Sequence, residues 1–372
     1  MDTVPIKAEQ LPTSEQPTEP EQPAEAKALP QQPAEPEPMY KDSVLAEDGD
    51  VLILLNDQSR IRTSSVVLSL ASLVFKKMLG PHFFEGQAPR SAVEPKQIAL
   101  MDDAPYAMTV LLNATHFRSM VGPLGFTFKS MAPELAKMGL LAHRYECVPA
   151  LSTGAEALML RRVNYLCLME VDPTEAIRFF GLYSSAAYSL RLKKLFQYFT
   201  RRLALDATTS FSTIGEVEAC DVLPTSVILG LEEQRSALRE YLIATIAART
   251  SGKCQTPGCS RSSPSSTFVS EITRKLALPH WPPPWSSTSI RDILQKLYKP
   301  IEVPFGHSFP VCQHANNAVS LTQREPRAIC KVADERACGL CLVCVRQEKP
   351  QSRCEHAAEL KEAALKDPIV QV

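Results

Sequence analysis

The chain has 372 residues, 45% of them hydrophobic and thirty of them proline, which suits two or three domains joined by substantial linkers. A formal net charge of −1 excludes a polycation built to coat nucleic acid. No stretch has the length of a membrane span, and the N-terminus lacks the basic-then-apolar pattern of a secretion signal. We therefore expect a protein of the nucleus or cytoplasm, whose eleven cysteines are free, buried or metal-bound rather than paired.

Residues 1–40 are rich in Pro, Glu, Gln and Ala, and hold eight acidic residues against two lysines. Such a composition offers little apolar surface to bury against the loss of chain entropy. This stretch is predicted to be a disordered, solvated tail.

The next stretch changes from strand to helix periodicity. Val51–Leu55 is an unbroken apolar run of strand length, and Asn56–Ser59 has the residue types of a turn. Together they predict a hairpin over residues 50–63. From Ser65 onward, apolar residues recur at helical spacing and place Phe75 on the inward side.

Further elements follow in order. Gln97–Leu100 predicts a third strand, and Pro105 marks the start of a helix. Apolar spacing predicts two more helices, over Pro133–Tyr145 and Leu151–Leu168.

Residues in the hairpin, the first helices and the third strand resemble the BTB/POZ domain, in the form common in fungal proteins. The matching positions are Gly49-Asp50-Val51, Arg62, Val67-Leu68, Ser72, Val74-Phe75, Met78 to Phe83, Ile98 to Met108, Leu111-Leu112 and His116. The resemblance implies an α+β fold over residues 43–151, with a small three-stranded sheet, surrounding helices and a mostly helical remainder.

BTB/POZ domains are protein-interaction modules that often self-associate, so the resemblance implies a non-catalytic adaptor or scaffold that forms a homodimer. The implied interaction surface comprises Asp50, Arg62, Val66, Leu70, Val74 and Met78. Two departures limit the inheritance. Ser64-Ser65 stands where animal transcription-factor relatives carry a His-Lys pair, and residues 115–130 lack the Glu of the cullin-binding motif. A substrate adaptor of a cullin-type ubiquitin ligase remains an alternative.

Residues 152–249 are predicted to be helical. Asp172-Pro173 predicts a helix start, with Asp as the cap and Pro at the first helical position. Leu190–Leu205 predicts an amphipathic helix whose basic residues form a solvated face. Thr225–Arg249 predicts a long helix with one apolar seam. The basic residues of the amphipathic helix are Lys193, Lys194, Arg201 and Arg202.

Residues 250–288 form a predicted linker, because Ser251–Thr267 is rich in Ser, Pro and Gly. Trp281 and Trp285 flank a run of prolines, and we expect the two rings to pack back onto the helices. Ser289 then opens a short helix that runs to Tyr298.

The final region, residues 289–372, gathers residue types that bind metal. Candidate ligands are His314, Cys338, Cys341, Cys344, Cys354 and His356. Zinc prefers four thiolate or imidazole ligands in a tetrahedron, and a turn with Cys-x-x-Cys spacing supplies two of them. The competing interpretation is a set of small buried thiols in an apolar segment, since free cysteine is among the most buried residue types. A zinc-binding nuclear regulator is thus a further alternative.

Motifs typical of enzymes are missing from the sequence. It contains no phosphate-binding loop with a Gly-Lys pair, no dinucleotide-binding glycine fingerprint and no nucleophile elbow. The sequence therefore predicts a protein without catalytic activity.

Overall fold

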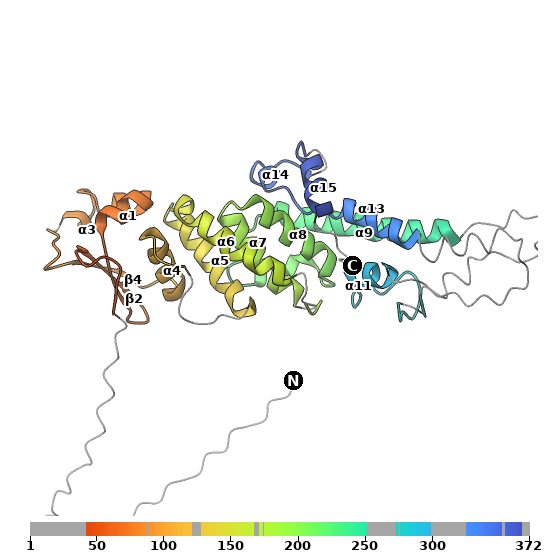
Figure 1. The fold of residues 1–372 in the computed structure, drawn as a ribbon, viewed down its shortest axis with the longest axis horizontal. Helices are drawn as coiled ribbons and strands as arrows, with labels where there is room; N and C mark the ends of the chain where they lie inside the picture. The colour runs from red at the N-terminus through yellow and green to blue at the C-terminus, as the bar shows by residue number, and fades with distance from the viewer. Residues whose placement is uncertain are drawn as a thin grey trace, which may run out of the picture. The chain divides into compact units, whose positions relative to one another are not determined.

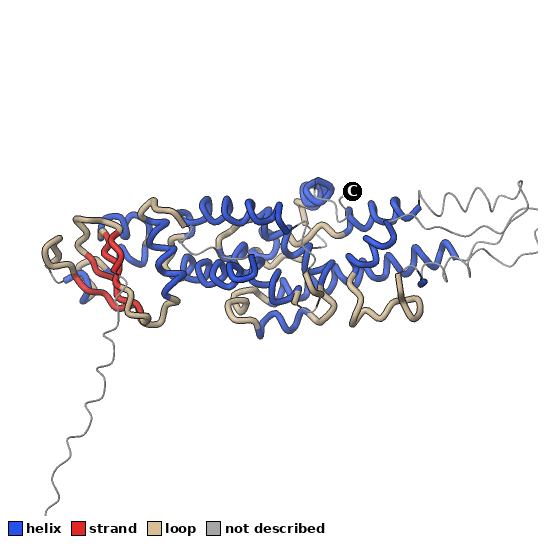
Figure 2. The backbone as a smooth tube through the Cα atoms, turned by 60° about the horizontal axis from the view of Figure 1, so that its bottom comes forward, coloured by secondary structure: helices blue, strands red, loops and turns tan. Residues whose placement is uncertain are grey.

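The computed structural model describes residues 42–87, 89–120, 128–166, 171–173, 175–250, 273–274, 276–298, 325–351 and 354–366. All of them belong to one contact unit, Tyr40–Val372. Within them the fold is α+β, with one small sheet early in the chain and helices thereafter (Figures 1 and 2), as the sequence predicts at that level. The predicted tail and the Ser251–Thr267 stretch lie outside the described residues.

The sheet is mixed and has four strands in the order β1-β3-β2-β4. Its central strand β2 (Val51–Leu55) pairs antiparallel with β3 (Arg60–Thr63), which is the predicted hairpin. Strand β4 (Lys96–Leu100) lies parallel to β2, and β1 (Asp42–Val44) lies parallel to β3. The sheet has one strand more than predicted, because β1 is too short to carry a periodic signal.

Two short helices follow the hairpin, α1 (Ser65–Ala71) and α2 (Leu73–Met78), before the single turn of α3 (Phe84–Gln87). They are separated at Ser72, whose backbone is extended, with φ −139° and ψ 125°. The Ser72 hydroxyl accepts a hydrogen bond from the Phe75 amide at 3.0 Å and caps α2.

Phe75 is fully buried, as its helical position predicts. Its ring stacks on Tyr145 with the ring centroids 4.7 Å apart. The Tyr145 hydroxyl in turn donates to the carboxylate of Asp103, which also pairs with Arg144. These contacts fasten the first helices to the end of a later helix.

That later helix, α5 (Phe128–Arg144), stands between α4 (Pro105–Thr115) and α6 (Val148–Leu166) in the chain. The start of α4 at Pro105 is the predicted one. Helix α5 begins five residues before the predicted start, so Pro133 lies inside it instead of opening it.

The next pair is α7 (Ala176–Ser189) and α8 (Lys193–Asp206). The predicted cap of α7 was wrong, because Glu175 rather than Asp172 occupies the N-cap. The Asp172 carbonyl accepts a hydrogen bond from the Glu175 amide at 2.9 Å, so Pro173 lies in a turn that precedes the helix.

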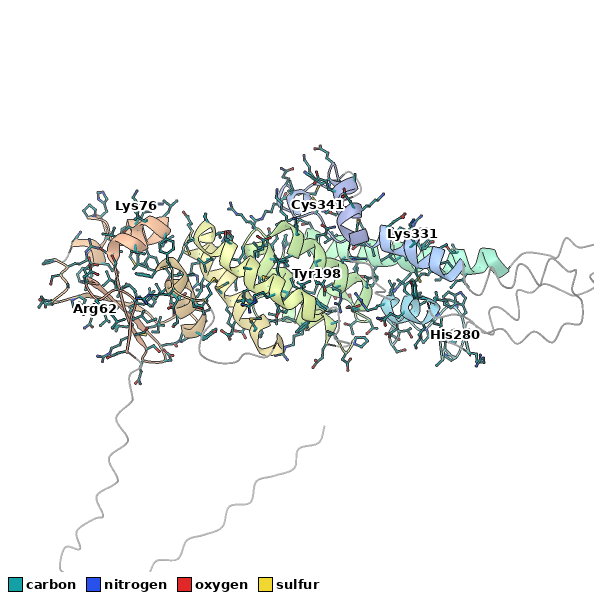
Figure 3. The ribbon with its side chains drawn as sticks, viewed as in Figure 1. Arg62, Lys76, Tyr198, His280, Lys331 and Cys341 are labelled. Carbon is teal, nitrogen blue, oxygen red and sulfur yellow. The ribbon has the colours of Figure 1, made fainter. Side chains whose placement is uncertain are left out.

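Helix α8 begins at Lys193, three residues after the predicted start at Leu190, and the prediction of a solvated basic face was correct for only two of its four residues. Lys193 and Lys194 are exposed as predicted, but Arg201 and Arg202 are buried. The Arg202 guanidinium donates to Asp206 at 2.7 Å and lies 4.5 Å from the centre of the Phe180 ring, so pairing compensates its burial. Arg202 also donates to the hydroxyl of Tyr198 (labelled in Figure 3) on the same helix.

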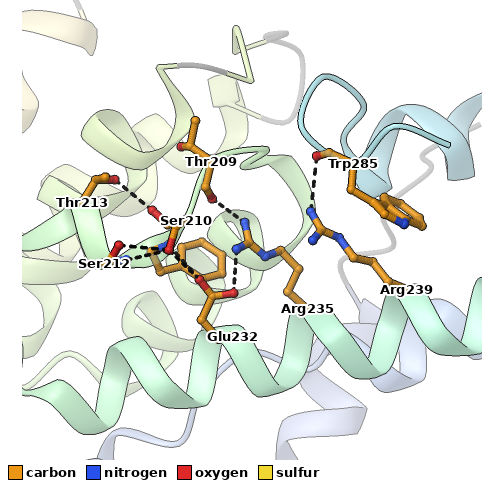
Figure 4. Close-up of polar contacts among 9 residues, drawn as sticks. Thr209, Ser210, Ser212, Thr213, Glu232, Arg235, Arg239 and Trp285 are labelled. Atoms are coloured by element: carbon orange, nitrogen blue, oxygen red, sulfur yellow. Dashed lines mark hydrogen bonds and ion pairs between the residues drawn. The ribbon is translucent and has the colours of Figure 1, made fainter.

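After a 3₁₀ turn, η1 (Phe211–Glu216), comes the long helix α9 (Thr225–Thr250). Figure 4 shows how α9 holds this turn: Glu232 accepts from the Phe211 amide at 2.9 Å and from Arg235 at 2.6 Å. Arg235 lies over the Phe211 ring, 4.0 Å from its centre. One turn further along, Arg239 lies over the Trp285 ring.

A second apolar core joins α9 to α11 (Ile290–Tyr298) and α13 (Glu325–Arg336). Trp281 and Trp285 pack against this core, as predicted. Ser289 opens α11 and accepts a hydrogen bond from the amide of Asp292 at 3.1 Å. Two last helices, α14 (Leu342–Arg346) and α15 (Ala357–Lys366), complete the described chain. Among the described helices, none combines the length and apolar character that crossing a bilayer requires.

Candidate metal centre and interaction surface

Four of the six predicted metal ligands converge. The ligand atoms of Cys341, Cys344, Cys354 and His356 all lie within 4.8 Å of one another, and together they could hold a metal ion. Figure 3 marks the position with Cys341. Two of the four come from the turn into α14 and two from the approach to α15, so a loop brings together residues ten and more positions apart.

Short local elements set this arrangement. Cys341 is the N-cap of α14, with extended backbone, and Cys344 follows one turn later on the same helix. Gln351 in the connecting loop accepts from the Cys341 amide at 2.8 Å, and its own amide lies 3.5 Å from the Cys341 carbonyl. The Cys354 amide donates to the Gln351 carbonyl at 3.1 Å. Gln351 therefore holds both halves of the site in register, a role that no sequence pattern indicated.

The separation of one sulfur and the ring nitrogen matches that expected around a tetrahedral zinc ion. Zinc bonds of about 2.3 Å to sulfur and about 2.0–2.1 Å to nitrogen place a sulfur and a nitrogen about 3.6 Å apart at tetrahedral angles. Cys341 Sγ lies 3.6 Å from His356 Nδ1. Cys341 and Cys344 are buried, whereas Cys354 and His356 are half-buried.

The raised pKa values of the thiols keep them protonated in the absence of a cation. Burial, together with contact with the sulfurs of Cys354 and Cys341, raises the pKa of Cys344 to about 12. Burial likewise raises the pKa of Cys354. Thiolates this close repel one another, and a divalent cation at their centre reverses that balance and favours deprotonation.

The remaining cysteines separate from the group. Cys338, also a predicted ligand, lies outside the four, and its sulfur accepts from the side-chain amide of Gln234 at 3.8 Å. Cys330 is a buried core thiol that donates to the Leu294 carbonyl. Cys147 and Cys220 are buried free thiols as well, and within the apolar segment 338–345, to which the buried-thiol interpretation applied, Cys341 and Cys344 are also buried. His314 lies outside the described residues.

The predicted interaction surface combines exposed and partly buried residues. Val66 and Leu70 are 65% and 84% exposed, one helical turn apart on α1. Val74 and Met78 on α2 are partly buried against the core. The exposed apolar set continues beyond these residues with Leu73, Phe83, Phe84 and Val93.

The two charged residues of that surface hold the backbone in place. Asp50 accepts from the Ser65 amide at 2.7 Å and from the Ser65 hydroxyl at 2.6 Å, and so supports the first turn of α1. Burial alone raises the pKa of Asp50, but these hydrogen bonds outweigh it and the pKa lies below its usual value. Ser65 thus replaces the basic partner that the resemblance would place there. Arg62 donates to the Gly49 carbonyl at 3.0 Å.

Comparison with known proteins assigns no family, since no protein-family model matches the chain and no curated protein matches its sequence.

Proposed function

We propose that this chain is a non-catalytic protein-interaction module of the BTB/POZ type that self-associates through α1 and its surroundings. The observation that supports this most is the concentration of exposed apolar side chains in one stretch of the chain. Of the eleven large apolar side chains that are exposed in the described residues, six lie between Val66 and Val93. Contiguous exposed apolar surface is typical of protein-interaction sites, and this stretch of the chain is where such a surface is proposed.

The composition of α1 favours a second copy as the partner. The helix reads SVVLSLA and carries no charged residue, so two copies meet without like-charge repulsion. A two-fold interface requires a self-complementary surface, which an uncharged apolar helix face supplies.

The test is the oligomeric state of the full chain, measured by light scattering over a range of concentrations. Leu70→Asp places a charge on the apolar face and should weaken self-association at least about tenfold, a loss of about 1.4 kcal/mol. Leu229→Asp makes the same change on α9, at a leucine that is 59% exposed, and should leave the oligomer intact. A wild-type chain that stays monomeric at every concentration would rule out the proposal.

The Cys341–His356 geometry supports a second function, structural binding of zinc. Three sulfurs and one nitrogen fill all four tetrahedral positions and leave none for water or substrate, which is typical of a structural site and not a catalytic one. Bonds to such an ion contribute folding free energy to a short segment.

Zinc content of the purified full chain tests this site. The wild type should hold one zinc, and Cys344→Ser should lose it. Cys338→Ser alters a neighbouring cysteine outside the four-atom group and should keep the metal. Loss of zinc from Cys338→Ser but not from Cys344→Ser would overturn the ligand set.

A further inference from the structure

The metal-binding segment lies against helices that are far away in the sequence. Here it is named the clasp segment, residues 338–351 and 354–360. The side-chain amide of Gln197 on α8 donates to the Cys338 carbonyl at 2.8 Å and to the Leu360 carbonyl at 2.7 Å. One buried side chain therefore binds the clasp segment just before its first ligand and just after its last.

The backbone of the same helix receives the segment closely. Gly339 has φ +76°, and a Cβ built there would lie 2.1 Å from the Gln197 carbonyl oxygen, so only glycine fits. The next amide, that of Leu340, donates to the Thr200 hydroxyl at 2.9 Å. Thr200 is fully buried and donates its own proton to the Phe196 carbonyl.

The clasp segment also makes apolar and aromatic contacts with α7 and α9. Leu340, Leu342 and Val345 of the clasp segment are buried in the main core. On α9, Gly230 leaves room for Leu340, since a Cβ there would lie 3.2 Å from a Leu340 methyl. Arg346 donates to the Tyr188 carbonyl at the end of α7 and lies 4.6 Å above the Tyr188 ring.

The docking of the clasp segment and the convergence of its ligand atoms depend on each other. The clasp segment contains only the five-residue helix α14 and the start of α15, so most of its apolar burial is against other helices. Its four ligand atoms, conversely, come together across a loop that Gln351 closes and that the Gln197 and Thr200 contacts hold against α8. Two events that require the same ordered loop are thermodynamically coupled, and the coupling is reciprocal.

We propose that metal binding and docking of the clasp segment on α8 are one coupled event, with Gln197 as the positioning residue. The inference rests on the proposed zinc site and adds what the metal controls. A bound metal locks the segment over α8 and α9. Metal loss releases it and exposes the apolar surface that Leu340, Leu342 and Val345 cover.

Two measurements on the full chain test this coupling. Hydrogen exchange should rise across 338–360 and in α8 when a chelator removes Zn²⁺, while the sheet region stays protected. Gln197→Glu keeps the size of the side chain but removes both donors, and it should weaken Zn²⁺ binding about 10–100-fold in a chelator competition. Gln97→Glu makes the same change on β4, where the side chain is exposed, and should leave Zn²⁺ affinity unchanged.

The outcomes separate the two proposals. A chain that holds no zinc refutes both the metal site and the clasp. A chain that holds zinc, but whose clasp segment and α8 exchange equally fast with and without chelator, refutes the clasp alone. The chelation measurement uses the wild type, so it decides the question even where Gln197→Glu fails to fold.

Discussion

In residues 42–115 the chain is held by backbone pairing and a dry core: β2 bonds to β3 and β4, and Phe75 is buried beneath α2. The clasp segment has no such ladder. It is held by the side chains of Gln197 and Thr200, a few apolar contacts and four potential ligand atoms. The first region therefore has backbone pairing of its own, whereas the clasp segment depends on contacts with distant helices and, under the proposal, on a metal.

The largest expected effect lies in the sheet region. Phe75→Ala should lower the free energy of unfolding by about 3–5 kcal/mol, because it removes a fully buried ring and leaves a cavity against Tyr145. Denaturant unfolding of the full chain measures this loss. A change below about 1 kcal/mol would mean that the sheet region does not depend on its core in the way this comparison requires.

A substitution on α9, one of the helices that the clasp segment contacts, should lower stability by a smaller amount. Glu232→Ala removes the acceptor shared by the Phe211 amide and Arg235, and leaves the Arg235 guanidinium buried without its carboxylate. Hydrogen bonds to charged groups contribute about 1.5–3 kcal/mol, so the free energy of unfolding should fall by that amount. Glu233→Ala, at the exposed neighbouring position, is the matched control and should change stability by less than about 0.5 kcal/mol.

The smallest effect is a pH dependence at the start of α1. His116 Nε2 accepts from the Ser64 amide at 3.2 Å, while Nδ1 faces the Leu112 carbonyl at 2.9 Å. Burial lowers the pKa of His116 below its ordinary 6.5; the bond to Leu112 opposes this shift, and Arg118 adds to it.

The sign of the pH effect follows from that lowered pKa. The unfolded chain takes up the proton at a higher pH than the folded chain does. The stabilisation is thus fully present above about pH 6.5 and is lost as the pH falls through the folded value. Unfolding measured between pH 7.5 and 5.5 should show the wild type losing more stability than His116→Gln. Parallel curves for the two proteins would exclude this role for His116.

The sequence predicts a region well where local signals determine its structure, and poorly where distant contacts do. The hairpin could be predicted because Val51–Leu55 and Asn56–Ser59 carry its signals locally. Two helices are expected here from the resemblance, with Phe75 on the second, but the position of the break between α1 and α2 could not be predicted, since Ser72 is neither Gly nor Pro and its capping geometry depends on a distant contact with Tyr145. The start of α7 was misplaced for a similar reason, because a capping pattern also fits the turn before the helix.

The sequence indicates which residue types could bind metal, but not which of the cysteines and histidines belong to the four-residue group. The spacing alone does not distinguish Cys338 from Cys341, because both precede the same short helix. What separates them is the docking of the loop, which directs Cys338 toward Gln234 on α9 and Cys341 toward His356. Gln197 and Gln351 carry no recognisable signal, since a glutamine that positions a backbone looks like any other in sequence.

The most direct test of the proposed metal centre, on which the clasp rests, is the coordination shell of the metal in the full chain, measured by X-ray absorption at the zinc edge. The structure predicts three sulfurs at about 2.3 Å and one nitrogen at about 2.0–2.1 Å, from Cys341, Cys344, Cys354 and His356. A shell of four sulfurs would put another cysteine in place of His356, and a shell of two sulfurs and two nitrogens would bring in a second histidine. Either result would contradict the account.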